Sequence, residues 1–217
     1  MCECVSVGVW ECGSVGVLGK AEIRERVKER RRGLDPEWVG DASRAAQDWV
    51  MELPEFESAG VVGCYMAMPT EVQTDVLLKC CNGAGKRVCV PARCPETRAY
   101  RLALLREGAE LTAGHMGIEE PAEREWVPVE GVDFIVVPGI GFDAAGGRVG
   151  YGGGNYDRIL APVAGNAGCF KVGLAFGFQV FDRVPVGDND ILMDAVITER
   201  AVLRVKTRNC RQEHKGG

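Results

Sequence analysis

The twenty residues GIGFDAAGGRVGYGGGNYDR, at positions 139–158, combine eight glycines with arginine, tyrosine and aspartate. They follow an apolar run, VDFIVVP at 132–138, which predicts a buried strand. Glycine allows positive φ and lets a ligand approach the backbone amides closely, and successive amides that lead into a helix bind anions. Asp157, just past the loop, is well placed to hold a magnesium ion that bridges phosphates. The pattern therefore predicts a site for a nucleotide or another phosphate.

Three other interpretations of this loop are weaker. Residues 139–144 fit a dinucleotide-binding fingerprint, but that fingerprint opens directly into a helix, and residues 145–150, AGGRVG, do not form a stable one. The chain also has no Gly-Lys-Ser or Gly-Lys-Thr of a P-loop. A flexible surface linker would be rich in Ser and Thr, whereas these glycines are interspersed with Arg148, Tyr151 and Asn155. A binding loop is therefore favoured.

Helices and strands alternate along the rest of the chain, which is typical of a mainly parallel sheet covered on both faces. We predict helices at 20–33, 36–53, 73–83 and 155–163, and strands at 59–66, 87–91, 100–105, 132–138, 170–176 and 194–198. Residues 106–130, rich in Glu, Gly and Pro, are predicted to form loops. The predicted fold class is α/β, with one three-layer α/β/α domain over residues 20–205. An unstructured extension (1–19), or alternatively a short hairpin, precedes this domain and a polar tail (206–217) follows it.

Composition and cysteine spacing exclude several classes of protein. No apolar run approaches the roughly 18 residues that span a bilayer, and the first 19 residues hold no Lys or Arg, unlike a secretory signal or a transit peptide. We therefore expect a cytoplasmic protein with no membrane partner. The ten cysteines form no C-x-x-C pair and the chain has two histidines, His115 and His214, so we expect no zinc and interpret the cysteines as reduced apolar residues. His115 is interpreted as a loop residue rather than a catalytic base.

The charge is unevenly distributed along the chain. The net charge is −5, but residues 20–32 contain seven Lys and Arg against three Glu, which places a basic segment on an acidic body. Such a segment suggests a local anionic ligand rather than general affinity for nucleic acid. Lys20, Arg24 and Lys28 recur every four residues and share one helix face, whereas residues 30–32 are interpreted as solvated. The basic residues are not interleaved with aromatics, so RNA binding is the weakest hypothesis and we expect no nucleic-acid partner.

The glycine loop resembles the signature of the 5-formyltetrahydrofolate cyclo-ligase family, also called 5,10-methenyltetrahydrofolate synthetases. The matching positions are Pro138, Gly139, Phe142, Asp143, Gly146, Arg148, Gly150, Gly152, Gly154, Tyr156, Asp157 and Arg158. Further motifs follow in the family's order, at residues 20–24, 65–75, 120–121, 174–179 and 184–190. The resemblance covers residues 20 to about 200. It implies the three-layer α/β/α fold shared with sugar-phosphate isomerases and CoA transferases.

The resemblance implies an enzyme of folate one-carbon metabolism. Its reaction would be the ATP- and Mg²⁺-dependent conversion of 5-formyltetrahydrofolate to 5,10-methenyltetrahydrofolate, with phosphorylation of the formyl oxygen, attack by N10, and release of ADP and phosphate. The resemblance implies catalytic roles for Arg148 and Asp157, and metal binding by Asp157 and Asp190. ATP contacts are implied for Lys20, Arg24, Arg148, Gly150, Gly152, Gly153, Gly154 and Tyr156. Folate contacts are implied for Met66, Glu71, Tyr151, Asn155 and Phe176. We expect a monomer whose partners are these two substrates.

The chain departs from the family pattern at three places. Asn155-Tyr156 stands where the family usually has two tyrosines, Pro91-Ala92-Arg93 where it has Pro-Arg, and Asn189-Asp190 where it commonly has His-Asp. The missing tyrosine leaves an aromatic wall of the folate pocket in doubt, and Asn155 could instead cap the helix that begins there. The alternative function is accordingly a catalytically silent homologue that binds folate or nucleotide. Simpler interpretations also exist for Glu71, as a carboxylate at a helix start, and for Asp190, as a turn residue.

Overall fold

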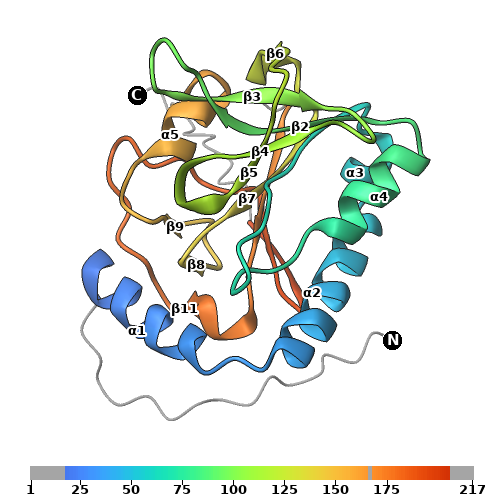
Figure 1. Cartoon of the computed structure of the whole chain (residues 1–217). Helices are drawn as coiled ribbons and strands as arrows, with labels where there is room; N and C mark the ends of the chain where they lie inside the picture. Colours follow the sequence, from blue (N-terminus) through green and yellow to red (C-terminus); the bar gives the residue numbers. More distant parts are fainter. Residues whose placement is uncertain (1–17, 166–167, 206–217) are drawn as a thin grey trace, which may run out of the picture.

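The computed structural model describes residues 18–165 and 168–205 of the 217-residue chain. Of the extension expected over residues 1–19, residues 1–17 lie outside the described residues, and so does the tail expected over 206–217. The main strands are Val61–Gly63 (β1), Arg87–Arg93 (β2), Tyr100–Leu105 (β3), Trp126–Val127 (β6), Phe134–Pro138 (β7), Phe170–Leu174 (β10), Ala195–Ile197 (β12) and Val202–Arg204 (β13). They form one eight-stranded sheet in the order β13-β12-β10-β7-β1-β2-β3-β6 (Figure 1).

The centre of this sheet is parallel and its edges are antiparallel. Strands β12, β10, β7, β1 and β2 pair in parallel, whereas β13 is antiparallel to β12, and β3 and β6 continue beyond β2 in antiparallel register. Parallel neighbours need long crossover connections, which are usually helices. The predicted α/β class with a mainly parallel sheet is therefore confirmed.

Helices cover one face of the sheet, and helices with a small second sheet cover the other (Figure 1). The helices are Lys20–Arg32 (α1), Pro36–Met51 (α2), Pro54–Ser58 (α3), Asp75–Gly83 (α4) and Asn155–Leu160 (α5), with 3-10 turns at His115–Gly117 (η1), Val129–Gly131 (η2), Ala161–Val163 (η3) and Gly177–Gln179 (η4). In β7, Phe134 and Val136 pack in the core shared with α2, α3 and α4, while Ile135 and Val137 pack in the core shared with α5 and η3. This alternation follows from the two-residue period of a strand. None of the helices within residues 18–165 and 168–205 is long and apolar enough to cross a membrane.

Capping and proline set the boundaries of α2 and α3. The side chain of Asp35 accepts a hydrogen bond from the amide of Glu37 at 3.0 Å, and Pro36 occupies the first helical turn. The predicted helix 36–53 ends earlier, at Met51, because Pro54 disfavours helical geometry at Leu53, whose backbone is extended. Pro54 then opens the short helix α3, which the sequence analysis did not predict.

Several short strands were also missed. Residues 106–130, predicted as loops, contain Leu111–Ala113 (β4), Glu119–Pro121 (β5) and β6. The glycine loop contains Gly141–Asp143 (β8) and Arg148–Val149 (β9), which join Val180–Phe181 (β11) in a three-stranded sheet. The edge strand β13 follows the strand that was expected to be last. Runs of two or three residues are too short to show the alternation by which a strand is recognised.

The carboxyl ends of the parallel strands meet at one edge of the sheet, where ligands bind in open α/β sheets. The segment with Tyr65 and Met66 follows β1, and the glycine loop follows β7. Helix α1 lies across this end of the molecule, beside β8 and β11 (Figure 1). Its apolar side chains Ile23 and Val27 are fully buried with Ile140 and Val149 of the glycine loop. The fold therefore brings the basic segment of the sequence against the glycine loop.

Candidate active site

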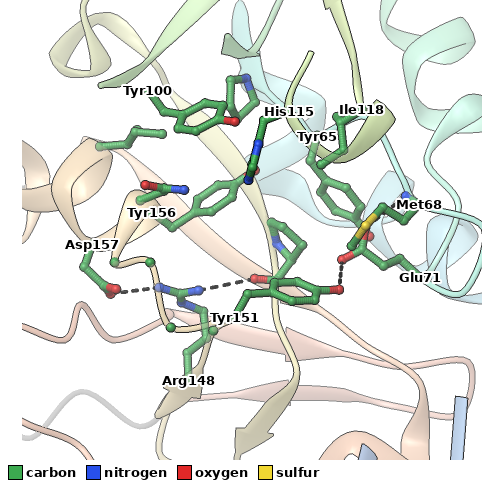
Figure 2. Close-up of a pocket in the computed structure, with 18 of the residues that line it drawn as sticks. Tyr65, Met68, Glu71, Tyr100, His115, Ile118, Arg148, Tyr151, Tyr156 and Asp157 are labelled. Carbon is green, nitrogen blue, oxygen red and sulfur yellow. Dashed lines mark hydrogen bonds and ion pairs between the residues drawn. The ribbon is translucent and has the colours of Figure 1, made fainter. Parts of the chain in front are cut away.

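A cavity of about 280 Å³ lies at this end of the sheet. Figure 2 shows how its lining divides, with Arg148 and Asp157 on one side and the rings of Tyr65, Tyr100 and Tyr156 on the other. All but one of the site residues inferred from the sequence line it, namely Lys20, Arg24, Met66, Glu71, Arg148, Gly150, Tyr151, Gly152, Gly153, Gly154, Asn155, Tyr156, Asp157 and Asp190. These residues come from both ends of the described chain and are gathered by the fold.

Phe176 is the exception. The sequence analysis expected it to contact folate, but its side chain is fully buried in the core and does not line the cavity. Its ring lies 4.9 Å from the ring of Trp38 and 5.7 Å from that of Phe178, measured between centroids. Aromatic pairs at these distances stabilise a core. Phe176 is therefore a packing residue at the end of the sheet, and the expectation of a folate contact is corrected.

Arg148, which is buried, and Asp157, which is partly exposed, form an ion pair at the polar side of the cavity. Arg148 on β9 is 6% exposed, and its Nη2 donates to Oδ1 of Asp157 at 2.8 Å (Figure 2). Its Nη1 donates to the carbonyl oxygen of Pro138 at 3.4 Å, and its Nε is buried with no partner in the described part of the chain. The amide of Ile191 also donates to Oδ1 of Asp157. The second oxygen of that carboxylate is thus left for a ligand.

Lys20 and Arg24 tie helix α1 to the rest of the polar side. The Lys20 ammonium pairs with Oδ2 of Asp190, which also accepts the amide of Gly187 at 2.6 Å. Burial raises the pKa of Asp190, but the Gly187 amide and Lys20 outweigh it and hold the pKa below its ordinary value. Arg24 donates from Nε to the carbonyl oxygen of Gly150 at 2.8 Å. Lys20, Arg24 and Arg148 therefore surround the glycine loop. The carboxylates of Asp157 and Asp190 balance only part of their positive charge.

The part of the glycine loop that lines the cavity owes its course to two glycines with positive φ. Gly152 has a φ of 106° and Gly154 a φ of 63°, backbone conformations in which a side chain would be strained. Gly154 is the N-cap of α5, so Asn155 is the first helical residue and its side chain caps no amide. Its Oδ1 instead accepts from Nη2 of Arg158 at 2.6 Å, and the same nitrogen donates to the carbonyl oxygen of Gly153. The helix-cap interpretation of Asn155 is therefore wrong.

A buried carboxylate marks the other end of the cavity. Glu71 is 4% exposed, and its Oε2 accepts the amide of Met68 at 3.0 Å. Its Oε1 lies 2.5 Å from the hydroxyl of Tyr151, which in turn accepts from Nη1 of Arg31 at 2.7 Å. Burial raises the pKa of Tyr151, and the nearby Glu71 raises it further. Glu71 is thus held in one orientation while it faces the cavity.

The ring of Tyr156 forms part of the apolar side. It packs against both main cores, and Figure 2 shows it beside Tyr100 and His115. Its hydroxyl is buried and has no hydrogen-bond partner among the described residues, and burial raises its pKa. A buried hydroxyl without a partner costs free energy unless a ligand satisfies it. The side chain thus offers both an apolar face and an unused polar atom.

Sequence reasoning missed several residues that line or support the cavity. Arg31 was interpreted as solvated but is buried, and His115, interpreted as a loop residue, begins η1 and lines the cavity. The other cavity residues to which no site role was assigned are Tyr65, Met68, Pro91, Tyr100, Pro138, Ile118 and Ile159. Most of them lie close in sequence to Met66, Pro121 or the glycine loop, but as apolar residues they look like ordinary core positions.

The donor set fits a hydrated magnesium ion but not a cage made only of protein. Within the described residues, no group of three or more His, Cys, Asp or Glu side chains gathers as a metal site. Mg²⁺ is commonly held by one or two carboxylates together with water and substrate phosphates. Asp157, one of whose oxygens has no partner within residues 18–165 and 168–205, and Asp190, at the same cavity, provide such carboxylates.

The fold and cavity together define an α/β protein with a glycine-rich, cationic site next to an apolar one. Its sequence from residue 18 to 199 matches the model of the 5-formyltetrahydrofolate cyclo-ligase family. The chain belongs to this family.

Individual relatives agree with that assignment. The 5-formyltetrahydrofolate cyclo-ligase of Escherichia coli K12 is 32% identical over 182 residues, which cover 81% of this chain and 98% of the relative. The mouse enzyme of the same name is 28% identical over 189 residues, covering 83% and 93%. The solved structure of 5,10-methenyltetrahydrofolate synthetase from Aquifex aeolicus superposes with a TM-score of 0.77 at 35% identity, covering 91% of this chain and 99% of that one.

Proposed function

We propose that this protein converts 5-formyltetrahydrofolate to 5,10-methenyltetrahydrofolate with cleavage of ATP to ADP and phosphate. In the proposed reaction the formyl oxygen attacks the γ-phosphoryl group of ATP, and ADP leaves. N10 of the folate then forms a bond to the activated carbon, N10 loses its proton, and the carbon–oxygen bond breaks as phosphate departs. The family to which the chain belongs supports this proposal, as does a cavity with two chemically distinct halves.

The polar half suits the nucleotide. Lys20 and Arg24 approach the glycine loop from α1, and the loop between Gly150 and Gly154 exposes backbone to the cavity. Cationic side chains and loop amides together neutralise phosphate oxygens. Asp157 and Asp190 would hold a magnesium ion, which when bound would offset the negative charge of the phosphates.

The apolar half suits the folate. Met66, Met68, Ile118, Tyr100 and Tyr156 line it, and Glu71 lies at its end. A flat heteroaromatic ring gains from burial against such side chains. The Glu71 carboxylate would accept hydrogen bonds from the N–H groups at the edge of the pterin ring, because an ionised carboxylate only accepts.

Arg148 is proposed to act where charge develops during phosphoryl transfer. Its guanidinium reaches the cavity between the glycine loop and Asp157, and it carries a buried Nε that makes no protein hydrogen bond within the described residues. Phosphoryl transfer needs positioned substrates and neutralised charge more than a protein nucleophile. A site made of arginine, lysine, aspartate and glycine supplies those two things.

The observation that carries this proposal is that one cavity holds both halves. A mixture of the purified protein, 5-formyltetrahydrofolate and Mg-ATP should gain the near-ultraviolet absorbance of the methenyl product, with one ADP and one phosphate formed per product. Omission of ATP should abolish the signal. Tight binding of the folate without any turnover would refute the enzyme assignment and favour the catalytically silent homologue.

A further inference from the structure

Three side chains from distant parts of the chain form a hydrogen-bonded row along the cavity. Arg31 of helix α1 contacts the hydroxyl of Tyr151 in the glycine loop at 2.7 Å. The same hydroxyl lies 2.5 Å from Oε1 of Glu71, which follows strand β1 (Figure 2). The row therefore connects the basic helix at the polar side with the carboxylate at the apolar side.

The direction of each hydrogen bond in the row is fixed by chemistry. A guanidinium only donates, so the Tyr151 oxygen must accept from Arg31, and the single phenolic hydrogen must then go to Glu71. Burial, reinforced by Glu71, raises the pKa of Tyr151, so that the phenol keeps this hydrogen at neutral pH. Arg31 thus determines where the Tyr151 hydroxyl points.

Arg31 is itself held rigidly. It is 7% exposed, whereas its neighbours Arg30 and Arg32 on the same helix are exposed. Its Nη2 donates at 3.1 Å to the carbonyl oxygen of Gly139, which also accepts from Gln179 at 2.9 Å. A buried arginine already bonded to one backbone carbonyl has little freedom left to lose when it orients a second group, here the Tyr151 hydroxyl.

Glu71 consequently has one protein donor on each carboxylate oxygen. The Met68 amide occupies one position on Oε2, and Tyr151 occupies one position on Oε1. Each carboxylate oxygen has two acceptor positions. The arrangement leaves one position on each oxygen for a ligand that presents two N–H groups side by side, as the edge of a pterin ring does.

We infer that Arg31 and Tyr151 are positioning residues for folate binding, in which Arg31 acts through Tyr151 to fix the Glu71 carboxylate. This inference rests on the proposed function. It makes the folate end of the cavity depend on an arginine from the helix that carries the nucleotide contacts.

A double-mutant cycle tests the inference. The protein is prepared as Arg31→Met, Tyr151→Phe and the combination, with Arg32→Met as a matched control on the exposed face of the same helix. The Kd for 5-formyltetrahydrofolate is measured by equilibrium titration, and KM is measured for folate and for ATP. We expect Tyr151→Phe to weaken folate binding about tenfold, the low end for loss of a hydrogen bond to a charged group. Arg31→Met should act in the same direction, and the combination should be no worse than Tyr151→Phe alone.

The control variant and the comparison of the KM for folate with the KM for ATP distinguish a positioning role from general destabilisation. Arg32→Met should leave both KM values and the melting temperature unchanged, and the KM for ATP should change less than about twofold in Tyr151→Phe. Arg31→Lys should recover part of the folate affinity. If Arg31→Met fails to fold, Tyr151→Phe still tests the contact with Glu71.

Three results would overturn the inference. Unchanged folate affinity in Tyr151→Phe would show that Glu71 needs no such support. Tighter folate binding would show that the phenol competes with the ligand, and additive effects of the two substitutions would show that Arg31 does not act through Tyr151. A wild-type protein that neither binds nor converts the folate would refute the proposed function, and the inference with it.

Discussion

Replacement of Asp143 with asparagine would test how the glycine loop is held against the rest of the site. Asp143, at the end of β8, is 2% exposed. Its Oδ1 accepts the amides of Ala145 at 3.0 Å and Gly147 at 2.8 Å, and its Oδ2 accepts the amide of Val184 at 2.9 Å. One buried carboxylate therefore joins the hairpin that carries Arg148 to the segment that leads to Asp190.

Asparagine has the same shape but only one accepting oxygen. It can keep the two bonds made by Oδ1, but its amide nitrogen then faces the N–H of Val184, and two donors meet. Loss of a hydrogen bond to a charged group costs roughly 1.5–3 kcal/mol, and a buried donor without a partner roughly 1–3 kcal/mol. Both costs arise from the same lost contact with the Val184 amide and therefore do not add in full. We expect the free energy of unfolding to fall by about 2–4 kcal/mol.

Urea denaturation, followed by circular dichroism, measures this change. Asp133→Asn is the matched control, because Asp133 is exposed and receives both of its amide bonds, from Gly60 and Val61, on the single oxygen Oδ2. An asparagine at 133 can therefore keep both bonds, and we expect it to cost less than about 1 kcal/mol. Equal losses of unfolding free energy in the two variants would contradict this explanation, in which both carboxylate oxygens of Asp143 accept hydrogen bonds.

Three further substitutions test the site and the fold. Asp157→Asn should lower turnover about a hundredfold or more while the protein stays folded, and normal turnover at ordinary magnesium would remove Asp157 from the chemistry. Asn155→Tyr restores the family's usual residue and should tighten binding of 5-formyltetrahydrofolate by roughly two- to twelvefold. Its cost is limited to the contact with the exposed Arg158, and titration showing unchanged or weaker affinity would contradict the aromatic contact. The hydrogen bond from Arg204 holds the pKa of Glu55 below its ordinary value. This pair therefore stabilises the fold at pH values above the pKa that Glu55 has in the unfolded chain. The stabilisation is lost as the pH falls through the lower pKa of the folded protein. Glu55→Gln should therefore cost at most about 1 kcal/mol at pH 7 and nothing in acid, and a difference in melting temperature that grows in acid would contradict this.

The sequence predicted the parallel centre of the sheet because those strands have a clear signal. The run Phe134–Pro138 is apolar on both faces, a pattern typical of a strand that is covered on both sides of the sheet. The outermost strand β6 and the small second sheet were not predictable in the same way. Strands β6, β8 and β9 have two or three residues each, and their pairing depends on partners far away in the chain.

The site was predicted as far as residue identity allows. The order of glycine, arginine and aspartate along the sequence indicates a phosphate-binding loop without any knowledge of the fold. Arg148 and Asp157 could therefore be chosen as candidate site residues. Arg31 could not, because three successive arginines look alike and only the position of the helix against Gly139 and Tyr151 buries the middle one. Phe176 was misassigned for the converse reason, since its motif lies near the site although its ring turns into the core.

The ion pair between Lys20 and Asp190 joins residues that are 170 positions apart. Arg24 and Gly150 add a second connection across 126 positions. During synthesis, the basic helix leaves the ribosome almost a full chain length before its partners exist, so the nucleotide side of the cavity can assemble only near the end of translation. If the polar side binds ATP as proposed, a nascent chain that does so must already extend past Asp190, which precedes β12. The ligand would then stabilise only molecules synthesised that far, and ATP binding would report how far synthesis of the chain has advanced.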